Sequence, residues 1–118
     1  MNKVVLGLIL SVTFVFAGKV SEGMWKQTSS TGGDCPNCKI SISKVTPHII
    51  QITSNNDLVG YAYYNQSKDN YKGAMEWKAG KGGTYKNVVF LITITYEGKT
   101  LTIKAKSDSA NFTTTYRQ

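Results

Sequence analysis

Apolar and polar positions alternate most regularly near the C-terminal end of the sequence, between Tyr85 and Lys106. Two apolar series flank the Glu97-Gly98 pair, the first made of Val88, Phe90, Ile92, Ile94 and Tyr96 and the second of Leu101, Ile103 and Ala105. A period of two places every member of a series on one face of a β-strand. A glycine-containing turn between two such series is typical of a β-hairpin. The pattern therefore predicts a long hairpin with one buried face and one wet face.

The rest of the sequence contains further segments of strand character, separated by turn-forming residues such as Pro47 and the Asn55-Asn56-Asp57 triplet. In the segment 58–64 both alternating sets of residues are apolar, so the pattern does not show which set faces inward. The others are 23–28, 39–45, 49–53, 71–78 and 111–117.

The expected strands number eight, and no segment has a convincing helical period. Short connections favour pairing between strands that follow one another in the sequence. We therefore predict an all-β fold, a small eight-stranded antiparallel up-and-down barrel, because closing the sheet removes its exposed edges. A sandwich of two sheets is the alternative.

The N-terminal segment has the pattern of a secretory signal peptide. Met1-Asn2-Lys3 is a basic start, 4–16 is almost entirely apolar, and Val15-Phe16-Ala17 has small residues where signal peptidase needs them. The apolar run is shorter than the roughly 20 residues that span a bilayer. We predict cleavage that leaves one domain, 18–118, exported to the periplasm or secreted, without a transmembrane segment.

The chain carries a formal net charge of +7, which falls to +6 once Lys3 is removed with the signal peptide. The basic residues are scattered over polar strand phases and turns, which is typical of a solvated surface with protected edges. Recognition of an acidic protein or of an envelope surface is the alternative interpretation. Export argues against a nucleic-acid partner.

Two cysteines are separated by two residues, in Cys35-Pro36-Asn37-Cys38. A β-turn with proline second and asparagine third brings the two Cα atoms within about 7 Å, close enough for a disulfide, and export favours oxidation. Zinc is a weaker alternative, since His48 is the only histidine and the site lacks a fourth ligand. A redox site is weaker still, because the segment after Cys38 is an expected strand and not an activating helix. We predict a structural disulfide, no metal site and no cofactor.

The sequence offers little for catalysis. His48 follows a turn and has no second histidine to work with, and no G-x-S-x-G motif is present. Most acidic residues lie in expected turns, where they favour local backbone hydrogen bonds: Asp34, Asp57, Asp69, Glu97 and Asp108. We therefore expect a protein that is not an enzyme and has no catalytic residues.

Gly23-x-Trp25 at the first strand and Arg117 at the end of the last resemble the lipocalin-like, or calycin, superfamily. Further segments are similar to small exported bacterial lipocalin-like proteins of unknown function: 71–77, 83–87, 101–103 and Tyr116-Arg117. The resemblance implies a barrel in which Trp25 lies across the floor and Arg117 packs over its indole.

A binding protein is the function that these expectations favour, holding a small apolar or aromatic ligand at the barrel mouth. The expected ligand-binding wall consists of Tyr61, Tyr63, Tyr71, Met75, Trp77, Phe90, Ile92 and Ile103. The same side chains could instead simply fill the barrel. The alternative function is a protein-interaction module, or an inhibitor of an exported hydrolase, acting through the loops at 31–37, 65–70 and 79–84.

Overall fold

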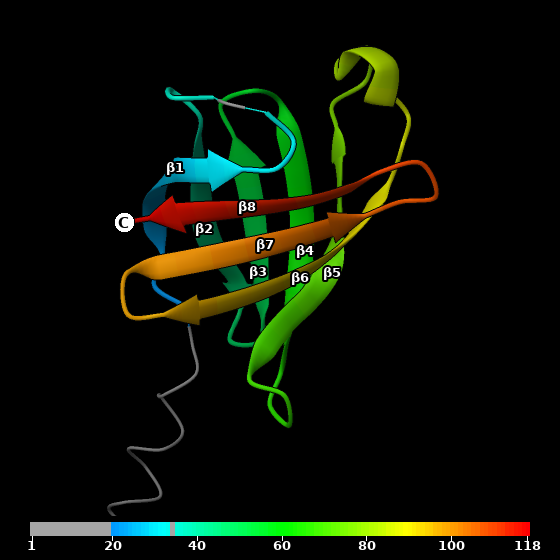
Figure 1. Ribbon diagram of the computed structural model, residues 1–118. Coiled ribbons are helices and arrows are strands. Elements are labelled where there is room, and N and C mark those ends of the chain that lie inside the picture. The colour runs from blue at the N-terminus through cyan, green and yellow to red at the C-terminus, as the bar shows by residue number, and fades with distance from the viewer. Residues whose placement is uncertain (1–19, 34) are drawn as a thin grey trace, which may run out of the picture.

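The computed structural model describes residues 20–33 and 35–118, and the predicted signal peptide lies outside the described residues. Eight antiparallel strands follow one another around a closed barrel, which confirms the predicted fold class and excludes the sandwich (Figure 1). The strands are β1 (Gly23–Ser30), β2 (Lys39–Thr46), β3 (Ile49–Ser54), β4 (Leu58–Asn65), β5 (Asn70–Trp77), β6 (Phe90–Glu97), β7 (Thr100–Lys106) and β8 (Asn111–Arg117).

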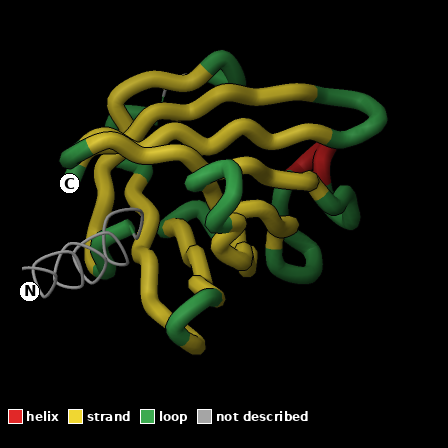
Figure 2. Tube along the Cα trace, turned by 90° about the horizontal axis from the view of Figure 1, so that it is seen from below, coloured by secondary structure: helices red, strands yellow, loops and turns green. Residues whose placement is uncertain are grey.

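The predicted hairpin is formed by β6 and β7, which pair from Leu91↔Lys106 to Glu97↔Thr100. Gly98 opens the two-residue turn with a φ of 60°, a left-handed conformation that glycine adopts without the steric cost of a Cβ atom. The hairpin is shorter at its N-terminal side than the alternation indicates. Val88 precedes β6, in the connection that carries the short 3-10 helix η1 (Gly83–Tyr85), coloured red in Figure 2.

The barrel closes where β1 meets β8, with Lys26 opposite Arg117 and Gln27 opposite Tyr116. The register shifts between Gln27 and Ser29, an irregularity of the kind that bends a strand and increases its twist. Because the barrel is closed, every strand in the described part of the chain has a partner on both sides, so these strands leave no open sheet edge.

One end of the barrel, which we call the closed end, is filled by side chains. Trp25 and Tyr71 are each 1% exposed, and Leu101 is fully buried. The segment before β1 adds to this packing: the backbone N–H of Val20 donates to the Tyr71 hydroxyl (3.3 Å), and Val20 itself is buried. The closed end is therefore a packed core rather than an opening.

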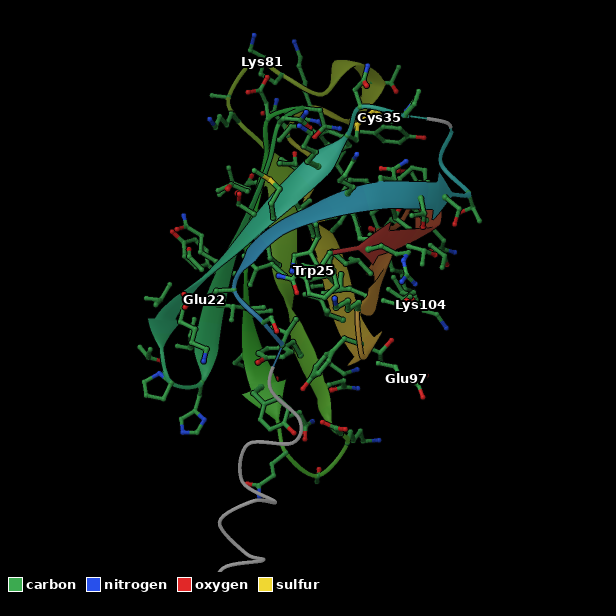
Figure 3. All side chains as sticks on the ribbon, turned by 90° about the vertical axis from the view of Figure 1, so that its left-hand side faces the viewer. Glu22, Trp25, Cys35, Lys81, Glu97 and Lys104 are labelled. Atoms are coloured by element: carbon green, nitrogen blue, oxygen red, sulfur yellow. A yellow bond between two sulfur atoms is a disulfide. The ribbon has the colours of Figure 1, made fainter. Side chains whose placement is uncertain are left out.

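The closed end differs in one respect from the arrangement that the family resemblance implies. Trp25 lies inside the barrel (Figure 3), and its indole Nε1 donates to the Ser21 carbonyl (3.3 Å). Arg117 is exposed, and its Nη1 donates to Thr100 Oγ1 (3.0 Å) instead of packing over the indole. Alternation along β8 gives the physical reason, since Tyr116 takes the inward position and its neighbour Arg117 is directed outward.

Candidate functional site

The opposite end of the barrel, which we call the mouth, contains a cavity of about 270 Å³. Strand ends and connections meet there: the loop before β2 and the η1 connection both lie at the top of Figure 1. The cavity has an apolar wall and a polar rim. The wall includes Ile40, Leu58, Met75, Trp77, Tyr85, Phe90, Ile103 and Phe112, and the rim includes Gln27, Ser30, Lys39, Ser54, Asn56 and Thr114.

Four aromatic rings form one side of the cavity. Trp77 and Tyr85 are stacked with their centroids 6.1 Å apart and their planes 17° from parallel. Phe90 packs edge-to-face with both rings, and its centroid lies 5.9 Å from each of theirs. The centroids of Phe112 and Tyr85 are 5.5 Å apart, and the two ring planes meet at 88°. These are the offset and edge-to-face geometries that aromatic pairs favour. The wall is therefore held in place by its own ring contacts, without a ligand.

The connection between β5 and β6 carries Tyr85 to the mouth. Trp77 is the last residue of β5. The backbone then turns at Gly82, which has a φ of 99°, and passes close to the Trp77 indole. A Cβ atom at Gly82 would lie 2.8 Å from Trp77 Cγ, closer than a carbon contact allows. Glycine at this position thus lets the backbone lie against the ring and places η1, with Tyr85, over the cavity.

The predicted disulfide joins Cys35 and Cys38 at the rim of the cavity, with 5.3 Å between the Cα atoms. The turn between them is the expected one, because the Cys38 N–H donates to the Cys35 carbonyl (3.0 Å). Asn55, in the β3–β4 turn, accepts from the Lys39 N–H (2.9 Å) and donates to the Asn37 carbonyl (2.8 Å). The cysteine turn is therefore fixed both covalently and to the neighbouring hairpin.

Several polar groups of the site lie where β1 meets β8. The hydroxyls of Ser30 and Thr114 are hydrogen-bonded to each other at 2.9 Å. Deeper in, burial raises the pKa of Tyr116 to about 12, so its phenol is neutral at physiological pH. The site therefore offers hydroxyls and amides, together with the Lys39 ammonium group, beside its apolar wall.

The predicted ligand-binding residues separate into three groups. Met75, Trp77, Phe90 and Ile103 line the cavity as expected of a barrel wall. Tyr71 and Ile92 are buried in the core, and neither is among the residues that line the cavity.

Tyr61 and Tyr63 require a correction, because both are exposed on the outer face of β4. The inward positions of this strand are taken by Gly60 and Ala62, which are buried. The strand was the one with two apolar phases, and the structure selects the phase with the smaller side chains. At Gly60 a Cβ atom would lie 2.5 Å from the Cβ of Met75 on the neighbouring strand, so this inward position has no room for a larger side chain.

Sequence reasoning missed three of the cavity's aromatic residues, Tyr85, Phe112 and Tyr116. Phe112 and Tyr116 alternate with threonines along β8, and this two-residue period was a usable signal that both face the interior. Tyr85 had no such signal, since it lies outside the strands, in a glycine-rich connection whose path depends on Trp77.

Within 20–33 and 35–118, no three His, Cys, Asp or Glu side chains are grouped closely enough to hold a metal ion. A separate observation on the same residues is that none of the helices has the length and apolar character required to cross a bilayer.

The closed eight-stranded antiparallel barrel is compatible with the lipocalin-like fold. Comparison of the chain with protein-family models, with curated proteins and with solved structures gave no significant match.

Proposed function

We propose that this chain is an exported, non-enzymatic binding protein of the lipocalin-like superfamily that holds a small apolar or aromatic ligand at its mouth. The observation that carries the proposal is the contrast within one barrel: side chains fill the closed end, whereas a cavity of about 270 Å³ remains among aromatic rings at the mouth. The Cys35–Cys38 disulfide supports export, because such bonds persist in oxidising compartments.

The size and chemistry of the cavity narrow the ligand class. Its volume is near the lower end of the roughly 300–1,000 Å³ of ordinary ligand pockets, which favours a compact molecule such as one with one or two rings. The flat faces of Trp77 and Tyr85 suit a planar ligand, and burying its apolar surface would contribute about 25 cal/mol per Å² before the costs of association. The hydroxyls of Ser30, Thr114 and Tyr116 would orient a polar substituent.

Tryptophan fluorescence tests the proposal, because only Trp25 and Trp77 contribute to it. In a Trp25→Phe background the signal comes from Trp77 at the cavity, and titration with 1-naphthol or 2-naphthoate should give a saturable change. Phe112→Ala in the same background should weaken binding by about tenfold or more, since it removes part of the wall. Tyr61→Ala is the matched control on the outer face and should leave the affinity unchanged.

Absence of a saturable change with either probe, combined with a protein mass in native mass spectrometry that carries no retained small molecule, would overturn the proposal. Equal weakening by Phe112→Ala and Tyr61→Ala would also contradict it, because the effect would then not come from the cavity.

Protein recognition through the mouth loops is the second candidate function. The observation that favours it is the cysteine turn, which the disulfide and Asn55 fix as a stiff projection. Stiff loops on a rigid scaffold lose little conformational entropy on binding a partner. Co-purification of an exported hydrolase with the wild type, lost in Asn55→Ala, would support this candidate, and retention of the partner by Asn55→Ala would argue against it.

A further inference from the structure

The basic side chains that are scattered along the sequence are gathered on one half of the closed barrel. Strands β7, β8, β1 and β2 are consecutive neighbours around the wall, because the barrel closes between β8 and β1. They carry one cation on β1, two on β2, two on β7 and one on β8, and none of the four contains Asp or Glu. The other four strands carry one lysine and two glutamates. Closure of the sheet therefore separates a basic half from a half with little net charge.

The strand register places three of these cations side by side. Lys26 lies opposite Lys39 on one side and opposite Arg117 on the other. Neighbouring strands are about 4.8 Å apart, so this row of three spans about 10 Å of the wall. Lys104 and Lys106 alternate with buried residues on β7, and Figure 3 shows Lys104 on the outside. All five side chains are exposed, and we call them the basic face.

Hydroxyl groups occupy outward positions between the cations of the basic face. Thr113 lies opposite Lys104 across the β7–β8 pair. In the next row along β8, Thr115 lies between Ser29 of β1 and Thr102 of β7. The Ser29 hydroxyl donates to the Thr115 hydroxyl (3.1 Å). The basic face is therefore a mixed surface of cations and hydroxyls that extends over adjacent strands.

Carboxylates lie at the margins of this half of the barrel. Glu22 precedes β1, and its Oε2 accepts a hydrogen bond from the Lys44 N–H (2.7 Å). Glu97 belongs to β6 and lies opposite Thr100, and Asp108 lies in the turn between β7 and β8. Consequently, no cation in the row of three has a carboxylate directly opposite it in the register.

The fold itself does not account for the basic face. Lysines protect the open edges of sheets, but the described strands leave no open edge. Within residues 20–33 and 35–118, no salt bridge joins a member of the basic face to a carboxylate. The row of three also disfavours folding, because like charges directly opposite each other on paired strands repel. An anionic partner would relieve this repulsion.

We propose that the basic face binds a linear acidic polysaccharide whose sugar units carry carboxylate or sulfate groups. The repeated anionic groups of such a polymer match cations on successive strands, and its sugar hydroxyls match the serine and threonine hydroxyls between them. Lysine and arginine bind oxoanions through charge-assisted hydrogen bonds. Arg117 donates from Nη1 to Thr100 (3.0 Å), and its guanidinium has further N–H donors for the polymer.

The composition of the basic half argues against other occupants. Its exposed large apolar side chains are Met24 on β1 and Val45 on β2, and β7 and β8 have none. Binding to a membrane surface uses inserted apolar or aromatic side chains in addition to charge, and protein interfaces centre on anchors such as tryptophan and tyrosine. A second copy of this chain would bring like charges together. A polyanion that binds through charge and hydroxyls fits what the surface offers.

Isothermal titration calorimetry of the full mature chain tests the proposal. Polygalacturonate supplies carboxylates, dextran sulfate supplies sulfates, and uncharged dextran is the control polymer. The wild type should bind at least one of the charged polymers and not dextran, with an affinity that falls as the salt concentration rises. Lys26→Gln/Lys39→Gln/Arg117→Gln should lower this affinity about tenfold or more, because it removes the row of three.

A second triple variant separates the basic face from net charge. Lys68→Gln/Lys72→Gln/Lys81→Gln removes the same charge outside the basic half and should lower the affinity less than about threefold. Circular dichroism confirms that both variants are folded. An equal loss of affinity in the two triple variants would overturn the proposal, because net charge alone would then bind the polymer.

The hydroxyls have a separate readout that leaves the charge unchanged. Thr102→Val/Thr113→Val keeps the β-branched shape of both side chains, so the strands should be retained. It should weaken binding of the acidic polysaccharide about threefold or more while binding of polyglutamate stays the same. Absence of binding to both charged polysaccharides would overturn the proposal. Tighter binding of polyglutamate, or of phosphatidylglycerol vesicles, would also overturn it and would indicate an acidic protein or a membrane as the partner.

Discussion

The two ends of this barrel are built from the same eight strands, yet one is packed and the other contains a cavity. At the closed end Trp25, Tyr71 and Leu101 are buried, and Val20 covers them through its hydrogen bond to Tyr71. At the mouth Phe90 is buried, but Trp77, Tyr85 and Phe112 are only partly buried, and a cavity remains beside them. The difference shows that this barrel has a cavity at the end where the rings are only partly buried and a packed core at the other.

The largest expected effect separates the two ends by stability. Tyr71→Ala at the closed end should lower the free energy of unfolding by about 3–5 kcal/mol, because it removes a large, fully buried side chain. Phe112→Ala at the mouth should cost about 1–2 kcal/mol, since its ring is only partly buried next to an existing cavity. Urea unfolding measures both values. Equal costs would mean that the mouth is as tightly packed as the closed end.

An intermediate effect on the free energy of unfolding should appear at alkaline pH. Burial raises the pKa of Tyr116 to about 12 and also raises those of Tyr71 and Tyr96. The pKa in the folded state exceeds the unfolded value of about 10, so this stabilisation is complete below pH 10 and is lost as the pH rises from 10 toward 12. Over this pH range, each of these tyrosines should lower the free energy of unfolding by about 1.4 kcal/mol per pH unit.

Urea unfolding at pH 8, 10 and 11 measures this loss, and Tyr116→Phe should make the dependence shallower. A stability that stays constant up to pH 11 would contradict the burial of these phenols.

The smallest effect isolates the contact that forms the mouth. Gly82→Ala should destabilise the protein by about 1–3 kcal/mol through its positive φ and its collision with Trp77. Gly80→Ala provides the matched control, because Gly80 has a φ of 80° but no atom within 4 Å of a Cβ there. It should show the backbone cost alone, at the lower end of that range.

The two alanine variants differ further in what they do to the site. Only Gly82→Ala should change the fluorescence of Trp77 and weaken ligand binding, because only it displaces the η1 connection. Identical spectra for both variants would show that Gly82 does not position the indole.

The sequence by itself determined the strands, their order and the cysteine turn, because these depend on local patterns. Alternation in β6 and β7 and the turn at Gly98 fixed the hairpin, and proline and asparagine between Cys35 and Cys38 brought the thiols together. Short connections then made consecutive strands neighbours, so the barrel followed from the order of the chain.

Tertiary structure alone decided which apolar phase of β4 faces inward, where the cavity lies, and that Tyr85 helps to form it. Tyr61 and Tyr63 alternate with Gly60 and Ala62 in a pattern that suits either face, and the choice depends on contacts made after the strands pair, such as that of Gly60 with Met75. Tyr85 reaches the mouth through contacts with Trp77 and Phe112, which are separated from each other by several strands. A two-residue period reports which side of a strand a residue occupies, but the space in front of that side exists only once the sheet has closed.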